Sequence, residues 1–331
     1  GHTKHLYQNP NLTFTQIKDI LTRASNGQLR GTEKVDGINI YLSFSIPEQK
    51  AIVARSKTDI KNGGLNLQQI NEKFKDRTGL QETFISAITS WENLMKSIDY
   101  GKQKLIFPFG AECYFNAEII DKNNPNVIRY DVSRVIIHTS GHLAPKENYQ
   151  VLSDEVRNSE QDTNNKVVMN EVKFLSGTNE KKFLVSFLQK LTEVQTKNNL
   201  LDEDIIGNIP IEDVIHDLSV CLLRNEKSSF IWNKSDEEWR LFLEVNKATK
   251  IIKNSKNEKA IKLIEKELAK LKNTDVVTSS CEGFVFSYAG ETYKLTGNFA
   301  PINQILGLFR YGRGKAIPPL NKVWKQPEEI R

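Results

Sequence analysis

Segments that predict β-strands lie on both sides of a long helical block, and this order constrains the fold more than any other feature. Strand patterns occur through residues 28–138 and return at residues 281–297. Between them, apolar residues recur at helical spacing, first at Phe183, Phe187, Leu188, Leu191 and Val194 and then at Ile211, Val214, Ile215, Leu218 and Leu222. We therefore expect an α+β fold in which residues 1–177 and 278–331 build one domain and residues 178–277 form an inserted all-α module.

The stretch Gly31–Asn39 joins two predicted strands, residues 28–30 and 40–46, and a third strand returns at residues 51–55. In this stretch Lys34 is followed by Val-Asp-Gly. A lysine amine is normally protonated, but on a strand end beside a phosphate, with a lowered pKa, it can attack phosphorus. The alternative is an ordinary charged hairpin, because Asp-Gly is common in turns.

Other elements follow from periodicity and turn residues. Helices are predicted at residues 14–25, 67–74 and 80–98, and short strands at residues 105–109, 111–115, 117–120, 127–130 and 134–138. Residues 56–64 read as a polar loop, and residues 143–168 read as polar and irregular. After the block, residues 281–288 and 291–297 predict a hairpin, and residues 301–311 a short helix.

Four charged residues stand in otherwise apolar strand segments: Lys34, Glu112, Glu282 and Lys294. Such side chains are rarely buried without a partner or a use. Together they suit one chemistry, in which a lysine attacks an α-phosphate, carboxylates hold Mg²⁺ and a second lysine neutralises phosphate charge. Glu118 also lies in an apolar segment, but this reasoning does not assign it a role.

Composition leaves the partner open. The formal net charge is +5, from 46 basic and 41 acidic residues, which permits a nucleic-acid partner without requiring one. Lysines of the block alternate with glutamates, which predicts either a solvated helix face or a nucleic-acid contact. Three widely spaced cysteines suggest a reducing compartment, and neither a membrane span nor a signal peptide is visible. We expect a soluble, cytoplasmic monomer.

The charged residues also occur in the order of a known superfamily. Glu33-Lys34-Val35-Asp36-Gly37 resembles the Lys-x-Asp-Gly motif of covalent nucleotidyltransferases, which include ATP-dependent DNA and RNA ligases and mRNA capping enzymes. Segments similar to the later motifs are Gly110-Ala111-Glu112, Glu282-Gly283-Phe284-Val285 and Tyr293-Lys294-Leu295, with Arg55 at the place of the arginine after the first hairpin. The resemblance covers residues 27–135 and 280–297. It implies antiparallel sheets of the nucleotidyltransferase (ATP-grasp-like) type with flanking helices.

The resemblance also implies a role for each residue. Lys34 would become lysyl-AMP, Glu33 would lie by the adenine edge, and Lys294 would bind the α-phosphate. Arg55 and Glu112 would contact the ribose or order the substrate end, while Glu112 and Glu282 would lie at the Mg²⁺ site. Asn39 is similar to an asparagine of RNA ligases that seal nicks in duplex RNA. The chain thus resembles most closely the nick-sealing phage RNA ligases, acting with ATP on 5′-phosphorylated nucleic-acid ends.

The sequence departs from the family pattern in three respects. Ser287 stands where DNA ligases usually carry a lysine, and threonines at 292 and 296 flank Lys294 where a second lysine is expected. Phosphate charge would then fall to fewer groups, or to Arg313 or Lys315 from the tail. In the region of the adenine-stacking aromatic, residues 134–140, His138 is the ring present. Only about 34 residues follow the last motif, too few for the OB-fold of DNA ligases and capping enzymes.

Several functions stay open on this evidence. The first reading is an RNA ligase, and an ATP-dependent DNA ligase is the alternative. A GTP-using capping-type enzyme and a catalytically decayed nucleic-acid-binding protein are further alternatives. The helical module, residues 178–277, would be a clamp on nucleic acid in place of the OB-fold. Neither the sugar of the joined strands nor a preference for nicked or single-stranded ends follows from the sequence.

Overall fold

The computed structural model describes residues 3–108, 112–124, 130–161, 164–176, 181–223, 226–230, 258, 262 and 281–296. The chain forms two compact units, one of Gly1–Val35 with Val172–Arg331 and the other of Asp36–Glu171. We call them the first and second units, and their sheets the first and second sheets. Each sheet is mixed, has five strands and is accompanied by helices, which confirms an α+β architecture at this level.

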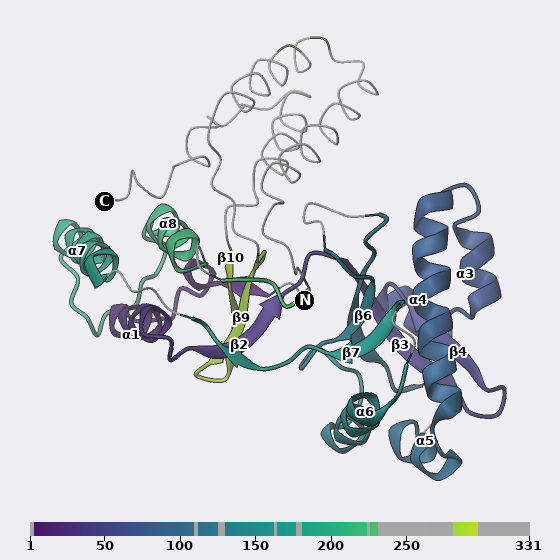
Figure 1. Cartoon of the computed structure of the whole chain (residues 1–331). Coiled ribbons are helices and arrows are strands. Elements are labelled where there is room, and N and C mark those ends of the chain that lie inside the picture. The colour runs from purple at the N-terminus through teal and green to yellow at the C-terminus, as the bar shows by residue number, and fades with distance from the viewer. Residues whose placement is uncertain are drawn as a thin grey trace. The chain divides into compact units, whose positions relative to one another are not determined.

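The first sheet assembles strands from distant parts of the chain, in the order β1-β10-β9-β2-β8. Figure 1 labels β10, β9 and β2 of this sheet. Its strands are β1 Lys4–His5, β2 Arg30–Lys34, β8 Lys173–Phe174, β9 Gly283–Tyr288 and β10 Glu291–Thr296. The unit also contains the short 3-10 helix η1 Leu6–Gln8 and the helices α1 Phe14–Ser25, α7 Lys181–Lys197 and α8 Glu212–Leu223. All strand pairs are antiparallel except β1 with β10.

Helices α1, α7 and α8 cover one face of the first sheet. Helix α1 begins at a capping box in which Thr13 and Gln16 exchange hydrogen bonds. Buried apolar side chains from the three helices and from β9 and β10 then form one core: Ile17, Ile20, Leu21, Phe187, Leu191, Ile215, Leu218, Phe284, Phe286, Tyr293 and Leu295. Residues 181–223 of the predicted separate module are therefore part of this core, and most of residues 231–280 lie outside the described residues.

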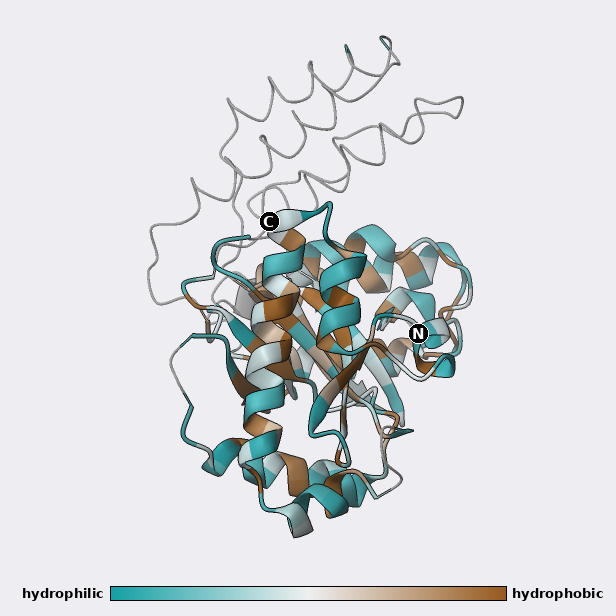
Figure 2. Cartoon of the chain, turned by 90° about the vertical axis from the view of Figure 1, so that its right-hand side faces the viewer, coloured by the Kyte–Doolittle hydropathy of each residue, from teal (hydrophilic) through white to brown (hydrophobic). Residues whose placement is uncertain are grey.

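The second sheet has the order β4-β3-β5-β6-β7 and is built mostly from segments close in sequence. Its strands are β3 Ile38–Ser45, β4 Lys50–Ala54, β5 Phe115–Ile120, β6 Arg134–Ile137 and β7 Lys166–Met169. Its helices are α2 Lys57–Lys61, α3 Leu67–Lys73, α4 Thr78–Ser97, α5 Tyr100–Ile106 and α6 Lys146–Asn158. Figure 2 looks onto the helical side of this unit, where hydrophobic and hydrophilic residues alternate along the helices.

Four local predictions differ from the structure. Residues 105–106 end helix α5 instead of starting a strand, because Gln103 and Ile106 are buried on one helical face while Leu105 is exposed. Helix α6 lies in the region predicted as irregular and buries Leu152 and Val156. Residues 57–61 form the short helix α2, capped by Ser56, within the predicted loop. Strand β2 extends to Lys34 instead of ending at residue 30.

Two predicted features, residues 109–111 and the helix at residues 301–311, lie outside the described residues. Within the described part of the chain, no helix has the length and apolar character needed to cross a membrane.

Candidate active site

The register of the first sheet places Lys34 and Lys294 on one face. Lys34 pairs with Gly283, which pairs with Thr296, while Thr32 pairs with Val285, which pairs with Lys294. Paired residues share a face, and so do residues two apart on a strand. Lys34 and Lys294 therefore leave the sheet on the side opposite the α1–α7–α8 core, and we call this side the lysine face.

Lys34 forms an ion pair with Glu282, which immediately precedes β9. Lys34 Nζ lies 2.8 Å from Glu282 Oε1, and the two side chains are 29% and 20% exposed. Gly283 follows Glu282, and a Cβ at this position would lie 2.4 Å from the carbonyl oxygen of Leu295. The Glu-Gly pair thus has a physical reason: glycine lets β9 approach β10 closely where the carboxylate meets the lysine.

Lys294 is half-buried beside this pair. Burial lowers the pKa of its ammonium group, the charge of Lys34 lowers it further, and Glu282 acts in the opposite direction. A phosphate would relieve this repulsion, since an anion between two lysines favours both charges. The lysine face therefore suits a phosphorylated ligand.

Glu33 points away from Lys34 into the core side of the sheet, because neighbouring strand residues alternate. Its side chain is 2% exposed. Its carboxylate accepts hydrogen bonds from the Ser228 hydroxyl at 2.7 Å and the Ser229 backbone N–H at 2.8 Å. Burial raises the pKa of Glu33, while the two hydrogen bonds and Lys173 oppose this rise. The Glu33 side chain therefore cannot reach an adenine bound on the lysine face. Only the backbone of Glu33 could contact such an adenine.

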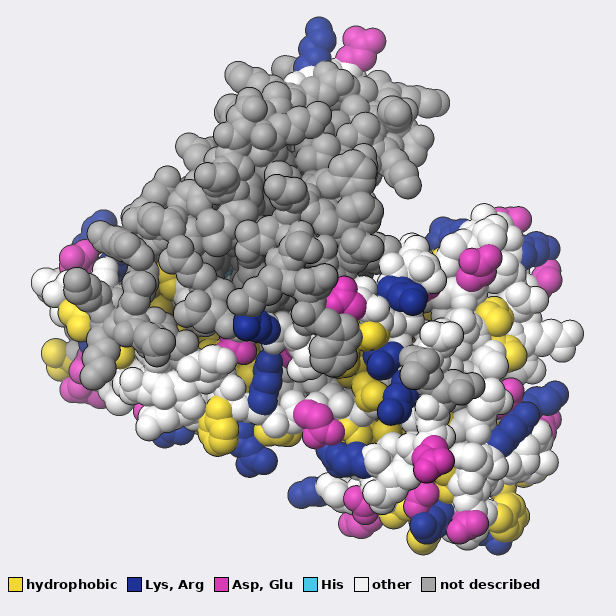
Figure 3. Space-filling view, viewed as in Figure 1, with side chains coloured by type: hydrophobic (Ala, Val, Ile, Leu, Met, Phe, Trp, Pro, Cys, Tyr) yellow, Lys and Arg dark blue, Asp and Glu magenta, His cyan; other side chains and the backbone are white. Residues whose placement is uncertain are grey.

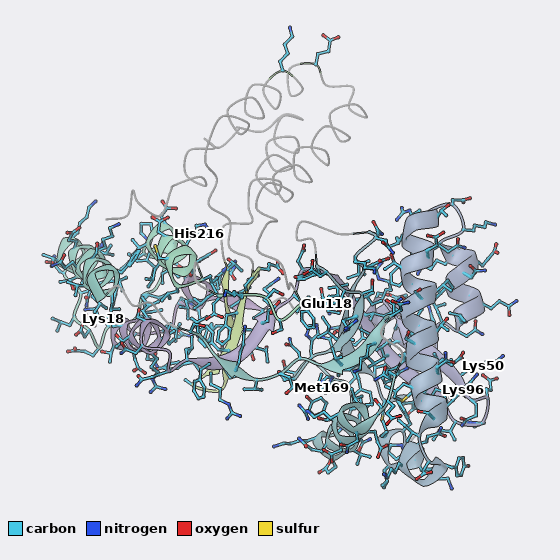
Figure 4. The ribbon with its side chains drawn as sticks, in the orientation of Figure 1. Lys18, Lys50, Lys96, Glu118, Met169 and His216 are labelled. Atoms are coloured by element: carbon cyan, nitrogen blue, oxygen red, sulfur yellow. The ribbon has the colours of Figure 1, made fainter. Side chains whose placement is uncertain are left out.

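In the second unit, Asn39 lies on a polar face of the sheet with a carboxylate and a histidine. Asn39 pairs with Glu118 across β3 and β5, and its side-chain amide donates to Asn116 Oδ1 at 2.8 Å. His138, just after β6, has its Nε2 3.1 Å from Glu118 Oε2. Figure 4 labels Glu118 among the strands of this unit. The structure thus joins two predicted residues, Asn39 and His138, through Glu118.

Glu112 and Arg55 differ in how far they match their predicted places. Glu112 is exposed and lies outside any strand, before β5 begins at Phe115. The carboxylate that the strand carries is Glu118, so the prediction of a strand-borne Glu112 in apolar surroundings is wrong. Arg55 does follow β4, as predicted, and its guanidinium carbon lies 5.0 Å from the Phe84 ring centroid on α4.

Sequence reasoning missed two residues of these faces. Glu118 was detectable, because it is also a charged residue in an apolar strand segment. The choice between Glu112 and Glu118 depends on where strand β5 begins. His5 on β1 pairs with Lys294 and carried no motif signal, since the parallel pairing of β1 with β10 is a tertiary feature. The predicted tail groups Arg313 and Lys315 lie outside the described residues.

Surface charge gives no separate indication of a partner. Over the described part of the face in Figure 3, lysine and arginine side chains are interspersed with aspartate and glutamate. Most lysines of the predicted basic block lie outside the described residues.

The donor set around Lys34 fits the magnesium that the resemblance implies. Mg²⁺ usually binds one or two carboxylates together with substrate phosphates. Glu282 provides a carboxylate beside Lys34, and the two lysines provide cations for the phosphates. Within the described ranges, no group of three or more His, Cys, Asp or Glu side chains is placed to hold a metal ion by itself. Substrate phosphates would therefore have to complete the coordination.

The lysine face thus combines a lysine amine, an adjacent carboxylate and a second lysine, a set of groups compatible with binding and attack of a phosphorylated ligand. Known proteins add nothing to this assignment: no protein family, curated protein or solved structure matches the chain.

Proposed function

We propose that this protein is an ATP-dependent polynucleotide ligase, of the RNA ligase kind, that works through a lysyl-AMP intermediate. One observation carries the proposal: Lys34, inside a Lys-x-Asp-Gly motif, meets Glu282 of a Glu-Gly-x-Val motif at 2.8 Å. The two residues are 248 positions apart in sequence. Lys294, of the segment that resembles the last, lysine-bearing motif, stands on the same face of the sheet.

In the first step, the Lys34 amine attacks the α-phosphorus of ATP. A bond forms between Nζ and phosphorus, the bond to the bridging oxygen breaks, and pyrophosphate leaves with the electron pair. The Glu282 carboxylate lies within hydrogen-bond distance and can accept the proton that the amine loses. Lys294 stabilises the charge that develops on the phosphate oxygens. Glu282 would also hold Mg²⁺, which would supply further charge neutralisation when bound.

In the later steps, AMP passes to a 5′-phosphate and a 3′-hydroxyl displaces it. A 5′-phosphate oxygen attacks the AMP phosphorus and the phosphorus–nitrogen bond breaks, which frees Lys34. The 3′-hydroxyl then attacks the 5′-phosphorus, the strands are joined and AMP leaves. Alignment and charge neutralisation provide most of the catalysis.

The RNA preference rests on the second sheet. Asn39 matches the asparagine of nick-sealing RNA ligases and is positioned by Asn116 and by its pairing with Glu118. The first unit binds the ATP phosphates through Lys34 and Lys294 in this proposal, and the family resemblance implies nucleotide-binding roles for Glu33, Asn39, Arg55, Glu112 and His138. The Glu118–His138 contact supports an oriented ring at His138 that could stack on adenine.

The deciding experiment is covalent labelling with α-labelled ATP and magnesium. We expect a labelled protein that Lys34→Ala abolishes and that the surface control Lys50→Ala leaves unchanged. An unlabelled wild type would refute the proposal, and labelling by GTP instead of ATP would favour a capping-type enzyme. Binding of nucleic acid without any labelling would favour a decayed scaffold.

A second experiment identifies the nucleic acid that the protein joins. The labelled protein is offered 5′-phosphorylated nicked duplexes and single strands made of RNA, DNA or both. We expect transfer of AMP and sealing to be fastest with a nick in duplex RNA. A preference for an all-DNA nick would identify a DNA ligase.

A further inference from the structure

His5 is the residue of the lysine face that no motif accounts for. It lies on β1, the edge strand of the first sheet, and pairs in parallel register with Lys294 on β10. Side chains in register leave a sheet from the same face. The imidazole of His5 stacks on Tyr7, with ring centroids 4.9 Å apart and planes 9° apart. The ring is thus oriented by a local contact.

Burial, together with nearby positive charges, keeps the His5 ring neutral. Burial lowers the pKa of His5 to about 4, with further contributions from Lys294, His216 and Lys34. His216 belongs to α8 (Figure 4), and the carboxylate of Glu282 balances part of the Lys34 charge. A neutral imidazole has one N–H donor and one acceptor. His5 can therefore donate a hydrogen bond to an anion without adding charge repulsion to the lysines.

The strand order places His5 at a defined distance from the nucleophile. From Lys34 on β2 the sheet continues through β9 to Lys294 on β10 and then to His5 on β1. Three strand spacings of about 4.8 Å and an offset of two residues along the strands separate the Lys34 and His5 backbones by about 16 Å. We call Lys34, Lys294 and His5 the row. It therefore extends well beyond one phosphate group.

The geometry of displacement at phosphorus gives this row a direction. In phosphoryl transfer the attacking and leaving groups lie roughly in line on opposite sides of the phosphorus. With Lys34 as the nucleophile and Lys294 beside the α-phosphate, the leaving group points along the row away from Lys34. His5 lies in that direction.

We propose that His5 binds the β- and γ-phosphates of the nucleotide, and hence the pyrophosphate that leaves, by donating a hydrogen bond from its neutral imidazole. This inference rests on the proposed function, because it takes Lys34 as the nucleophile. It goes beyond that function by assigning a pyrophosphate contact to a strand outside all the motifs.

The test uses the reverse of the first step. Labelled lysyl-AMP protein is isolated and treated either with pyrophosphate or with a 5′-phosphorylated nick. In the first reaction a pyrophosphate oxygen attacks the AMP phosphorus, the phosphorus–nitrogen bond breaks, and ATP and the free lysine form. We expect His5→Ala to raise the pyrophosphate concentration for half-maximal release about tenfold, while the rate of AMP transfer to the nick stays within twofold.

Two further variants make the result specific. His5→Gln retains an N–H donor and should recover at least half of the lost pyrophosphate affinity. Lys4→Ala removes a charge from the neighbouring position, where Lys4 pairs with Glu291 at the surface, and should behave as wild type. Equal pyrophosphate dependence of His5→Ala and wild type would overturn the inference, and so would an equal loss in both reactions.

A binding measurement separates this inference from the proposed function. Tripolyphosphate, added to the wild type without nucleotide, should shift the NMR signals of the His5 ring, which are assigned with His5→Gln. It should also raise the pKa of His5, because the anion offsets the charges of Lys294 and Lys34. If no lysyl-AMP forms but these shifts occur, the ligase proposal fails and the polyphosphate site stands. Absence of the shifts refutes the site.

Discussion

The two sheets have the same general construction but carry different chemistry. Each has five strands, one parallel pair and a face packed on helices. On the other face, the first sheet presents Lys34, Lys294 and His5, whereas the second presents Asn39, Glu118 and His138. A row of cations and a neutral donor suits phosphates, and a face of amides, a carboxylate and a ring suits polar groups of a base or sugar.

The contrast shows that the architecture of a sheet does not determine which ligand chemistry it carries. The helix-covered faces of both sheets are mostly apolar, with the buried Glu33 as a charged exception in the first sheet. The outer faces differ only in which residues occupy the alternate strand positions, and these positions determine what each sheet can bind. Four predictions test this contrast and are given in decreasing order of effect.

Removing the second cation of the lysine face should have the largest effect. Lys294→Ala is expected to slow formation of the labelled adduct about 10²- to 10³-fold, because the developing phosphate charge loses a positioned partner. The matched control is Lys166→Ala on β7 of the second sheet, which should stay within twofold of wild type. Initial rates of labelling measure both. Similar losses in the two variants would contradict the contrast between the sheets.

The buried carboxylate behind Lys34 should matter for stability. Glu33→Ala leaves the Ser228 and Ser229 donors without their acceptor, so we expect a loss of about 1–3 kcal/mol in urea unfolding. Glu33→Gln keeps an acceptor for Ser229 and should lose less. Because burial raises the pKa of Glu33, the folded state holds this proton to higher pH than the unfolded state. The contribution of Glu33 to wild-type stability therefore falls as the pH rises from its unfolded-state pKa to its folded-state pKa.

The glutamine variant should not show this fall with pH. Urea unfolding of wild type and Glu33→Gln at several pH values provides the comparison. Parallel stability profiles would mean that Glu33 is already ionised in the folded state at low pH.

In the second sheet, the carboxylate that orients His138 should affect nucleotide affinity more than catalytic rate. Glu118→Ala removes the 3.1 Å contact to His138, and we expect the KM for ATP to rise about tenfold. We expect kcat for adduct formation to change less than threefold, because Lys34 and Lys294 remain. Glu48→Ala, an exposed change in the same unit, serves as control. A large drop in kcat at unchanged KM would mean that the second sheet shares the chemistry of the first.

The smallest effect concerns the pH dependence of the second unit. His142 Nδ1 accepts the Asn116 backbone N–H at 3.0 Å, and the ring stacks on Tyr149. Burial lowers the pKa of His142 to about 4, with His138 nearby. On acidification, His142 binds a proton at higher pH in the unfolded chain than in the folded protein. The free energy of unfolding therefore falls as the pH drops from about 6.5 towards 4.

His142→Asn keeps an acceptor for Asn116 and should remove part of this fall, of the order of 1 kcal/mol between pH 7 and pH 5. Thermal or urea unfolding at the two pH values measures it. An unchanged pH profile would show that other groups account for the acid sensitivity.

The accuracy of the sequence predictions depended on whether a feature is determined by neighbouring residues or by residues far apart in the chain. The β3–β4 hairpin, helix α1 and helix α4 follow from alternation, capping and apolar periodicity within short windows, and they were predicted closely. Helix α5 was taken for a strand, because a short apolar run satisfies both periods until its neighbours are known. Glu112 was chosen over Glu118 because Gly110-Ala111-Glu112 resembles a family motif, whereas the structure shows that Glu118 is the carboxylate on β5.

The amino-acid sequence provides the reactive groups: a lysine before Val-Asp-Gly, a Glu-Gly pair and a lysine on the last described strand. Which of these residues meet depends on the tertiary fold. Pairing of β2 with β9 and of β9 with β10 brings Lys34 to Glu282 and aligns Lys294 on the same face, while pairing of β1 with β10 adds His5. The physical reason is that strand alternation is encoded locally, whereas register between distant strands is set by packing of the shared core.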